Sequence, residues 1–241
     1  MQARKDAFGR TVYGCFKGKS TSETIERDDG FIDIGKDGAK RYFAEFKDWL
    51  PMERSAIKLA HGKILDVGCG AGRVELYFQK RRYEILGIDN SPLAIKVCKL
   101  RGVKNVKIMS FAKIGNLKQH FDTVVLFGTN FGLLGNYKNS KILLRKLYKI
   151  TTKSATIIAA SRDPYDTKNK SDIAYNEANL RKGRMFGQLR IRVRYKSYLG
   201  EWFDYLFVSK AEMRSLLNGT GWEIKKFYGK APRYIAIIEK T

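Results

Sequence analysis

The chain has 241 residues, with 47 Lys and Arg against 24 Asp and Glu, which gives a net charge of +23. Its length suits one large domain or a core with an appendage, and 44% hydrophobic residues exclude a disordered chain. The charge favours either polyanionic partners or a highly charged, solvated surface. No apolar run approaches the ~20 residues of a membrane span, and no signal peptide is expected. Three dispersed cysteines and two histidines argue against a disulfide framework or a metal site, so we expect a cytoplasmic protein.

The first 60 residues are expected to form an N-terminal arm followed by helices. Frequent glycines in residues 1–38 argue against long elements there. This part is compatible both with a lid that closes over a ligand site and with a packed surface appendage. From Ala39 to Ala60 the apolar spacing predicts two helices, with Pro51 near the start of the second.

A strand, a glycine-rich turn, a helix and a second strand follow one another from Lys63 to Asn90. An apolar run predicts a buried first strand, and the second strand ends on Asp89. The turn between them has glycines at three alternate positions: Gly68, Gly70 and Gly72. Glycine lets backbone approach a ligand closely, and Asp89 is placed to accept hydrogen bonds from ribose hydroxyls. The stretch therefore predicts half of a nucleotide-binding α/β sheet.

The spacing of the glycines narrows the choice of nucleotide. A dinucleotide fingerprint would need a glycine at position 73, which is Arg73, and no Gly-Lys-Ser/Thr follows for a P-loop. Asp66, just before the turn, would repel a pyrophosphate but suits a cationic ligand. The sequence from Asp66 to Gly72, Asp-Val-Gly-Cys-Gly-Ala-Gly, with Gly-Ile-Asp89 further on, resembles motif I and its acidic follow-on in class I S-adenosylmethionine-dependent methyltransferases. The alternative is a glycine turn in some other α/β protein.

This resemblance implies an α/β fold with a seven-stranded, mostly parallel, doubly wound sheet whose last strand is antiparallel. It covers roughly residues 40–163 and 209–241, and it implies S-adenosylmethionine as the cofactor. At the third strand's end the family usually has an acid for the adenine amino group, whereas this chain has Ser110. The cofactor-binding residues implied are Asp66, Gly68, Cys69, Gly70, Gly72, Asp89, Asn90, Ser110, Phe111 and Gly128.

The remaining core elements follow from apolar runs and helix signals. Ser91-Pro92 is a helix start, and Ser209 with Glu212 forms a capping box at another. Further strands are expected over 103–109, 121–127, 155–160, 222–228 and 234–239, and a helix over 138–150. We place the core at residues 61–163 and 209–241, the arm and its helices at 1–60, and a substrate-side β-hairpin insertion at 164–208.

The insertion contains a strictly alternating stretch. Leu189 and every second residue after it are apolar or aromatic, while a row of cations occupies the other face: Arg190, Arg192, Arg194 and Lys196. The row is compatible with a nucleic-acid backbone, with one anionic substrate, or with a solvated face that protects an edge strand. A turn at Leu199-Gly200 is expected to lead into a second strand and complete an antiparallel hairpin.

Methyl transfer from a sulfonium is an in-line displacement in which the protein mainly orients and desolvates the reactants. A hydroxyl or carbon acceptor also needs a base. His61 and His120 each precede a core strand, at the edge opposite the expected site, so both are interpreted as structural. The catalytic residue is therefore unknown; the candidates are Asn130, Tyr137, Asp163 and Tyr165, with Arg162 and Asp204 also near the expected mouth.

Three functions stay open from the sequence. The first is a methyltransferase for a small molecule, with an anionic acceptor among the candidates. The second is a methyltransferase for RNA or a ribonucleoprotein, suggested by the charge, and the third is a non-catalytic protein that binds a nucleotide or partner on the same fold. The absence of an appended RNA-binding motif favours the small molecule. No metal and no membrane partner are expected.

Overall fold

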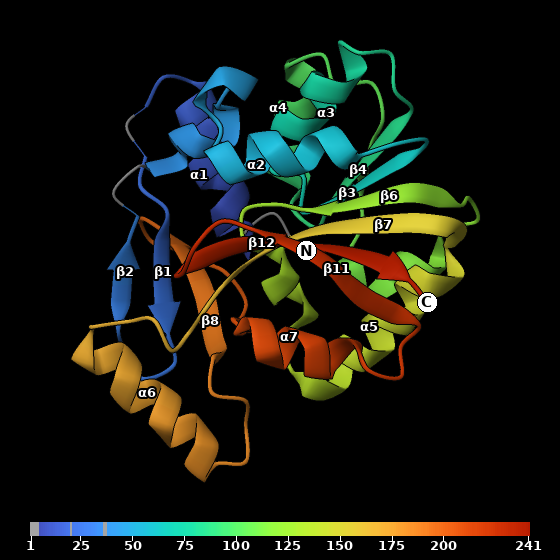
Figure 1. Cartoon of the computed structure of the whole chain (residues 1–241). Helices are drawn as coiled ribbons and strands as arrows, with labels where there is room; N and C mark the ends of the chain where they lie inside the picture. Colours follow the sequence, from blue (N-terminus) through green and yellow to red (C-terminus); the bar gives the residue numbers. More distant parts are fainter. Residues whose placement is uncertain (1–4, 20, 36–37) are drawn as a thin grey trace. The chain divides into compact units, whose positions relative to one another are not determined.

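The computed structural model describes residues 5–19, 21–35 and 38–241. Residues 1–4, 20, 36 and 37, which belong to the predicted N-terminal arm, lie outside the described residues. The strands form two sheets, one of seven strands and one of five (Figure 1).

The seven-stranded sheet has the order β11-β12-β7-β6-β3-β4-β5. Pairing is parallel between β4 and β5 and between β6 and β7, whereas β12 is antiparallel to both β7 and β11. This confirms the predicted α/β fold with an antiparallel last strand. The strands are β3 (Ile64–Val67), β4 (Ile85–Asp89), β5 (Val106–Ile108), β6 (Phe121–Leu126), β7 (Thr151–Arg162), β11 (Trp222–Tyr228) and β12 (Arg233–Lys240).

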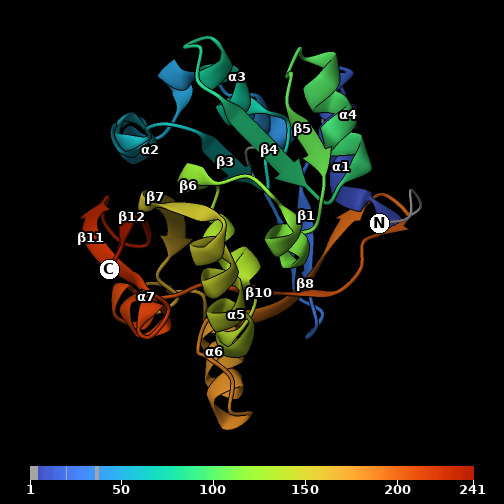
Figure 2. The same ribbon diagram turned by 90° about the vertical axis from the view of Figure 1, so that its right-hand side faces the viewer.

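The chain divides into two compact units, which we describe separately. Unit 1 comprises Met1–Trp49, Leu65–Phe111 and Arg190–Phe203, and unit 2 comprises Leu50–Ile64, Ala112–Leu189 and Asp204–Thr241. The main helices of unit 1 are α1 (Ala7–Phe16), α3 (Arg73–Gln79) and α4 (Pro92–Leu100). Figure 2 shows α1 next to α4. Their interface contains the buried side chains of Val12, Ala71 and Val97, with aromatic rings of the N-terminal segment packed around them.

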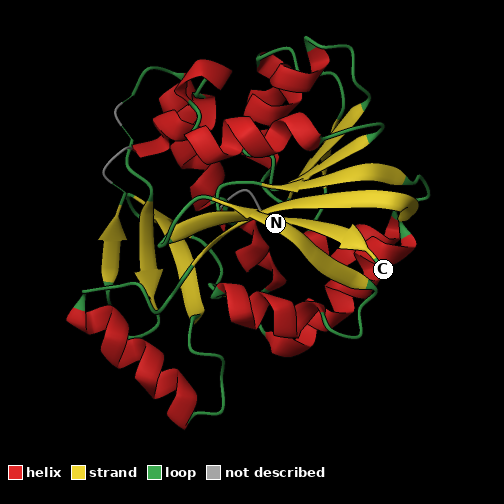
Figure 3. Ribbon diagram, in the orientation of Figure 1, coloured by secondary structure: helices red, strands yellow, loops and turns green. Residues whose placement is uncertain are grey.

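Unit 2 is built on β6, β7, β11 and β12, which Figure 3 shows as neighbouring yellow arrows. Its helices are α2 (Pro51–Ala56), α5 (Tyr137–Lys149), α6 (Lys170–Arg181) and α7 (Lys210–Leu217). The predicted capping box of α7 is present, since Glu212 N donates to Ser209 Oγ and Ser209 N donates to the Glu212 carboxylate. The centre of the unit is apolar, with Phe121, Phe131 and Tyr234 fully buried.

The second sheet joins the N-terminal segment to the insertion. Its order is β10-β8-β1-β2, with β9 also paired to β8. The strands are β1 (Thr24–Arg27), β2 (Ile32–Ile34), β8 (Gln188–Tyr195), β9 (Tyr198–Leu199) and β10 (Phe203–Leu206). The predicted hairpin exists, but β8 also pairs with β1, placing Glu26 opposite Arg192 (Figure 1). Since β8 lies between two strands, one of the three interpretations of its cation row, a face that protects an edge strand, was wrong.

One local prediction was also wrong, and one helix was not predicted. The first helix expected after Ala39 is a pair of 3-10 turns, η2 (Gly38–Phe43) and η3 (Phe46–Asp48), although Pro51 does begin α2, which runs into η4 (Ile57–Leu59). Helix α6 was not predicted, because its sequence has no apolar stripe. Two buried asparagines anchor it instead: Asn179 donates to the carbonyls of Phe186 and Gln188, and Asn176 donates to that of Pro164.

Candidate functional site

The glycine turn between β3 and α3 has the backbone geometry that its sequence predicts. Gly68, Gly70 and Gly72 all have positive φ, at 77°, 55° and 81°. A Cβ on Gly72 would lie 2.6 Å from Val103 Cγ2, and one on Gly70 would lie 3.1 Å from Tyr42 Cδ1. Both positions therefore require glycine, for conformation and for space.

Asp89, at the end of β4, holds the turn from the other side. Its Oδ2 accepts from Gly70 N at 3.0 Å and its Oδ1 accepts from Ser91 N at 2.9 Å. Each oxygen has a second lone pair with which to accept from a ribose hydroxyl. Burial raises the pKa of Asp89 to about 6, against the opposing effect of the two backbone donors. Asp89 is therefore mostly ionised at neutral pH.

Two further carboxyls are buried beneath the turn. Burial raises the pKa of Asp66 to about 7, and it raises that of Glu75, in α3, well above its usual range, with the neighbouring Asp66 adding to the effect. Neither Glu75 carboxyl oxygen has a hydrogen-bond partner of good geometry among the described residues. Burial therefore favours the protonated form of Glu75. The sequence analysis did not identify it, although an acid inside an apolar helical run was a usable signal.

The N-terminal segment covers the turn. Phe8 and Tyr42 pack edge to face, with ring centroids 5.3 Å apart, and both rings lie within 4 Å of the Cβ position of Gly70. Asp6 is fully buried and fixes this arrangement: it caps α1 through Gly9 N and accepts from Ser91 Oγ at 2.9 Å and from Leu93 N at 3.0 Å. Neither Asp6 nor Tyr42 was predicted as a site residue. The lid function of this segment stays a prediction.

The other residues predicted to bind the cofactor are placed as follows. Cys69 is buried in the turn, and its neighbour Cys98 donates its thiol hydrogen to the Gly70 carbonyl. Asn90 and Ser110 are exposed, and Phe111 is buried at the start of η5 (Phe111–Asn116). Gly128 belongs to unit 2, where it follows β6 with φ 67° and is exposed.

The loop after β6 is held in an unusual backbone conformation. Thr129 has φ 70°, which is rare for a β-branched residue and costs of order 1–3 kcal/mol. Tyr205, in β10, stabilises it by donating from its hydroxyl to the Thr129 carbonyl at 2.7 Å. A Cβ on Gly132, in η6 (Asn130–Leu134), would lie 2.3 Å from the Tyr205 ring. Tyr205 was not predicted as a site residue, because its partner Thr129 lies 76 residues earlier in the chain.

The four candidate catalytic residues all belong to unit 2. Asp163 and Tyr165 share the turn after β7, where Tyr165 N donates to Asp163 Oδ1 at 3.0 Å. The Tyr165 ring stacks on Phe186 with centroids 4.2 Å apart, and its hydroxyl donates to Glu212. Burial and Glu212 raise the pKa of Tyr165 to about 12, so this hydroxyl is a donor rather than a base. Asn130 begins η6, and Tyr137 is half exposed at the start of α5.

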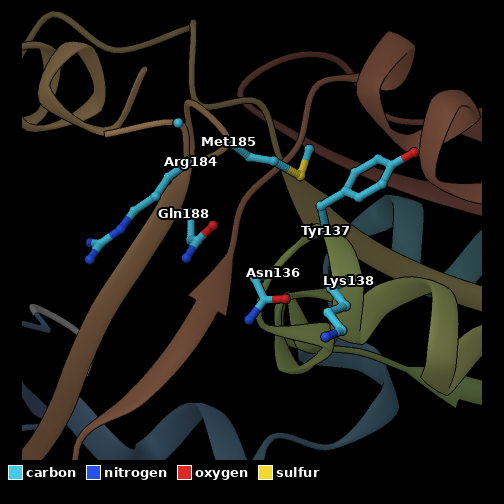
Figure 4. A pocket seen from close by; sticks show the side chains of 7 residues that line it. Asn136, Tyr137, Lys138, Arg184, Met185 and Gln188 are labelled. Atoms are coloured by element: carbon cyan, nitrogen blue, oxygen red, sulfur yellow. The ribbon is translucent and has the colours of Figure 1, made fainter. Parts of the chain in front are cut away.

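Tyr137 also lines an open pocket of about 470 Å³ in unit 2. Its lining residues come from the start of α5 and from the segment after α6 (Figure 4): Asn136, Tyr137, Lys138, Gly183, Arg184, Met185 and Gln188. The Asn136 side chain is fixed by a 3.1 Å hydrogen bond to Asp204 Oδ2. The pocket combines two cations, two amides, a phenol and a thioether, and none of the described residues that line it is acidic.

Two of the four cations in the predicted row on β8 are paired with one acid of the same sheet. Glu26, on β1, forms a two-point ion pair with Arg192 at 2.7 and 2.9 Å, and Arg194 lies 3.3 Å from the same carboxylate. The Arg192 guanidinium also stacks on Trp202 at 4.5 Å. The alternation itself is confirmed, since Ile191 and Val193 are buried. The pairing of Arg192 and Arg194 with Glu26 was not predicted, because β1 was not predicted to lie next to β8.

Two further properties concern the described part of the chain. Of its helices, none is both long and apolar enough to cross a membrane. Within residues 5–19, 21–35 and 38–241, no three or more His, Cys, Asp or Glu side chains are grouped so that they could hold a metal ion.

The chain is similar to known methyltransferases in sequence and in structure. Residues 64–153 match the family model of a methyltransferase domain. The chain is similar to an S-adenosylmethionine-dependent methyltransferase from Bacteroides fragilis, solved in complex with S-adenosylhomocysteine, with 26% identity and a TM-score of 0.84 over 100% of this chain and 97% of that one. No curated protein matches the sequence.

Two more distant structures share the fold alone. One is an S-adenosylmethionine-dependent methyltransferase from Methanosarcina mazei, with 18% identity and a TM-score of 0.61 over 80% of this chain and 98% of that one. The other is an amino pentose methyltransferase from Micromonospora echinaspora, involved in calicheamicin biosynthesis, with 14% identity and a TM-score of 0.52 over 84% and 95%.

Proposed function

We propose that this chain, a class I S-adenosylmethionine-dependent methyltransferase, transfers the methyl group in line to a small-molecule acceptor that carries an anionic group. The observation that supports this acceptor is the pocket of about 470 Å³ in unit 2. Its volume lies within the roughly 300–1,000 Å³ of small-molecule sites. Lys138 and Arg184 provide its charge, which favours a carboxylate or phosphate on the acceptor.

The residues of unit 1 fit the cofactor. Gly70 lacks the Cβ that would close the turn, and Asp89 keeps acceptor capacity for two ribose hydroxyls. Asp66 places a carboxylate beneath a turn that would bind a cationic ligand. When bound, S-adenosylmethionine supplies a methyl group on a positively charged sulfur. We assign cofactor binding in unit 1 to Asp66, Gly68, Cys69, Gly70, Gly72, Asp89, Asn90, Ser110 and Phe111. Gly128, in unit 2, stays a prediction.

The chain's own part in the reaction is mainly to orient the acceptor and exclude water. An amine acceptor needs only to be neutral when it attacks. For a hydroxyl acceptor, Asp163 is the residue we favour as the base, because the Tyr165 hydroxyl already donates to Glu212 and stays protonated. Asn130 and Tyr137 are assigned to acceptor positioning.

Methylation of RNA is the second candidate, and the net charge of +23 favours it. In the row of cations that pointed most directly to RNA, Arg192 and Arg194 are engaged by Glu26, which weakens that argument.

A labelling experiment separates the two candidates. The protein is incubated with methyl-labelled S-adenosylmethionine and a cell extract, with and without prior nuclease treatment, and the label is followed by filtration. Because unreacted cofactor also passes the filter, the filtrate is then separated by chromatography. We expect a labelled low-molecular-mass product distinct from S-adenosylmethionine, formed equally with and without nuclease. Label that is retained on the filter and lost after nuclease treatment would establish RNA as the acceptor instead.

A further inference from the structure

The N-terminal segment brings an acid, a guanidinium and a phenol together beside the glycine turn. Strands β1 and β2 form a hairpin that returns the chain to its start: Gly35 N donates to the Glu23 carbonyl at 2.9 Å, and Ala39 N donates to that of Thr21 at 3.1 Å. The turn η2 then begins. As a result, Glu23, which precedes β1 in the chain, contacts Arg41 and Tyr42, which follow β2.

The three side chains are mutually bonded. Tyr42 Oη donates to Glu23 Oε1 at 2.7 Å, Arg41 Nη2 donates to Glu23 Oε2, and the same Nη2 lies 3.2 Å from Tyr42 Oη. The side chain of Glu23 is 10% exposed and that of Arg41 is 51% exposed. A buried carboxylate and an accessible guanidinium are thus bonded directly to each other, and the phenol hydroxyl is bonded to both.

This cluster lies at the glycine turn, because the Tyr42 ring covers Gly70 at 3.1 Å from its Cβ position. Gly70 N, on the same residue, donates to Asp89, which we assign to the ribose. A molecule whose ribose is bound at Asp89 and which lies along the turn therefore meets Tyr42 next. In S-adenosylmethionine, the group that extends from the ribose through the sulfur is an amino acid, with a carboxylate and an ammonium on one carbon.

We propose that Glu23, Arg41 and Tyr42 form the subsite for the amino-acid end of the cofactor, which rests on the proposed function. Arg41 binds the carboxylate in a charge-assisted hydrogen bond, Glu23 accepts from the ammonium, and Tyr42 holds both in place. The internal Glu23–Arg41 pair keeps each charge oriented before the ligand binds, so little side-chain entropy is lost on binding. The alternative is a purely structural cluster that fastens η2 to the hairpin.

The test compares two ligands by calorimetry. S-adenosylhomocysteine has the amino-acid group, whereas 5′-methylthioadenosine has the same nucleoside and sulfur but lacks it. For Arg41→Gln we expect S-adenosylhomocysteine to bind roughly 10- to 100-fold more weakly, as when a charged hydrogen bond is lost, and methylthioadenosine to bind as in wild type. Arg41→Lys should recover part of the loss. Tyr42→Phe, which keeps the ring, should show a smaller loss for S-adenosylhomocysteine alone.

Arg81→Gln is the matched control, because Arg81 is an exposed arginine of the same unit that stacks on Tyr77 at 3.7 Å. It should bind both ligands normally. Equal weakening of the two ligands in Arg41→Gln, or weakening of neither, would overturn the subsite. Failure of wild-type protein to bind S-adenosylhomocysteine would instead overturn the proposed function and the subsite with it.

Discussion

In unit 1, an acid of the second sheet and three acids around the glycine turn have pKa values shifted in opposite directions. Glu26, in the second sheet, lies between Arg192 and Arg194, and its hydrogen bonds with Arg192 lower its pKa. Asp66, Glu75 and Asp89, around the glycine turn, are buried, and their pKa values are raised. Pairing makes Glu26 part of the scaffold. The acids at the turn carry a desolvation cost that a bound cation or hydrogen-bond donor can offset.

The largest effect should come from closing the turn. Gly70→Val places a branched side chain against Tyr42 at a residue with φ 55°, so we expect the affinity for S-adenosylhomocysteine to fall by more than about 100-fold. Calorimetry measures it. Gly102→Ala is the matched control, since Gly102 has φ 84° but nothing within 4 Å of its Cβ position. It should lose some stability and keep its affinity; an equal loss of affinity there would attribute the effect to backbone strain.

Asp89→Ala should weaken S-adenosylhomocysteine by roughly 10- to 100-fold, because hydrogen bonds to an ionised carboxylate are removed. The pKa of about 6 adds a pH signature. Wild-type affinity should fall as the pH drops below about 6, where the carboxyl is protonated and becomes a poorer acceptor, and the variant should lose this dependence. Glu26→Gln should leave the affinity for S-adenosylhomocysteine and its pH profile unchanged. If Glu26→Gln weakened binding as Asp89→Ala does, Glu26 and Asp89 would not differ in function as we infer.

The unliganded protein should be stabilised by Asp66→Asn. The pKa of Asp66 is raised from its ordinary 3.8 to about 7, so the unfolded chain releases the proton first and the free energy of unfolding falls as pH rises between these values. Replacing the buried carboxylate with a neutral amide should raise the free energy of unfolding by on the order of 2 kcal/mol at about pH 8 and by little at about pH 4. Urea unfolding at both pH values measures it. If Asp66→Asn is less stable than wild type at the higher pH, neighbouring groups already stabilise the ionised Asp66 carboxylate in the unliganded protein.

The smallest effect should come from Arg192→Gln. Its ion pair with Glu26 is partly buried, so the variant should lose about 1 kcal/mol of unfolding free energy. The pKa of Glu26 is lowered by Arg192, and the stabilisation it gives is present at neutral pH and lost as pH falls through that lowered pKa. The variant should therefore lose this acid-range dependence and bind S-adenosylhomocysteine normally. Wild-type-like stability throughout would show that the pair contributes nothing.

The part of the fold that could be predicted is the part determined by neighbours in sequence. The glycine turn, Asp89 and the Ser91 cap all lie within about 30 residues, where apolar runs and helix signals are sufficient. The second sheet was missed because β1 has only four residues and pairs with β8, more than 160 residues later. Arg41 and Tyr42 were missed because the spacing after Ala39 imitates a helix, whereas a 3-10 turn and the hairpin bring them to Glu23.

Helix α6 shows a different limit of sequence reasoning. Its buried positions include Asn176 and Asn179, which cap backbone carbonyls of the flanking segments, and a pattern search for apolar residues does not detect such anchors. Such a search does not detect Tyr205 either, because it stabilises the loop after β6 through one hydroxyl, which donates to the Thr129 carbonyl, and through its ring, which lies against Gly132. Such contacts become visible only when distant segments are placed together.

The pairing of β1 with β8 has a consequence for synthesis. The hairpin of β1 and β2 leaves the ribosome early, but a two-stranded hairpin is at best marginally stable alone. Its third strand is not complete until residue 195, and the Glu26–Arg192 pair joins residues 166 positions apart in the chain. Closing so long a loop is slow. The N-terminal segment is therefore translated first and completed late, while the glycine turn that it covers is finished by residue 90.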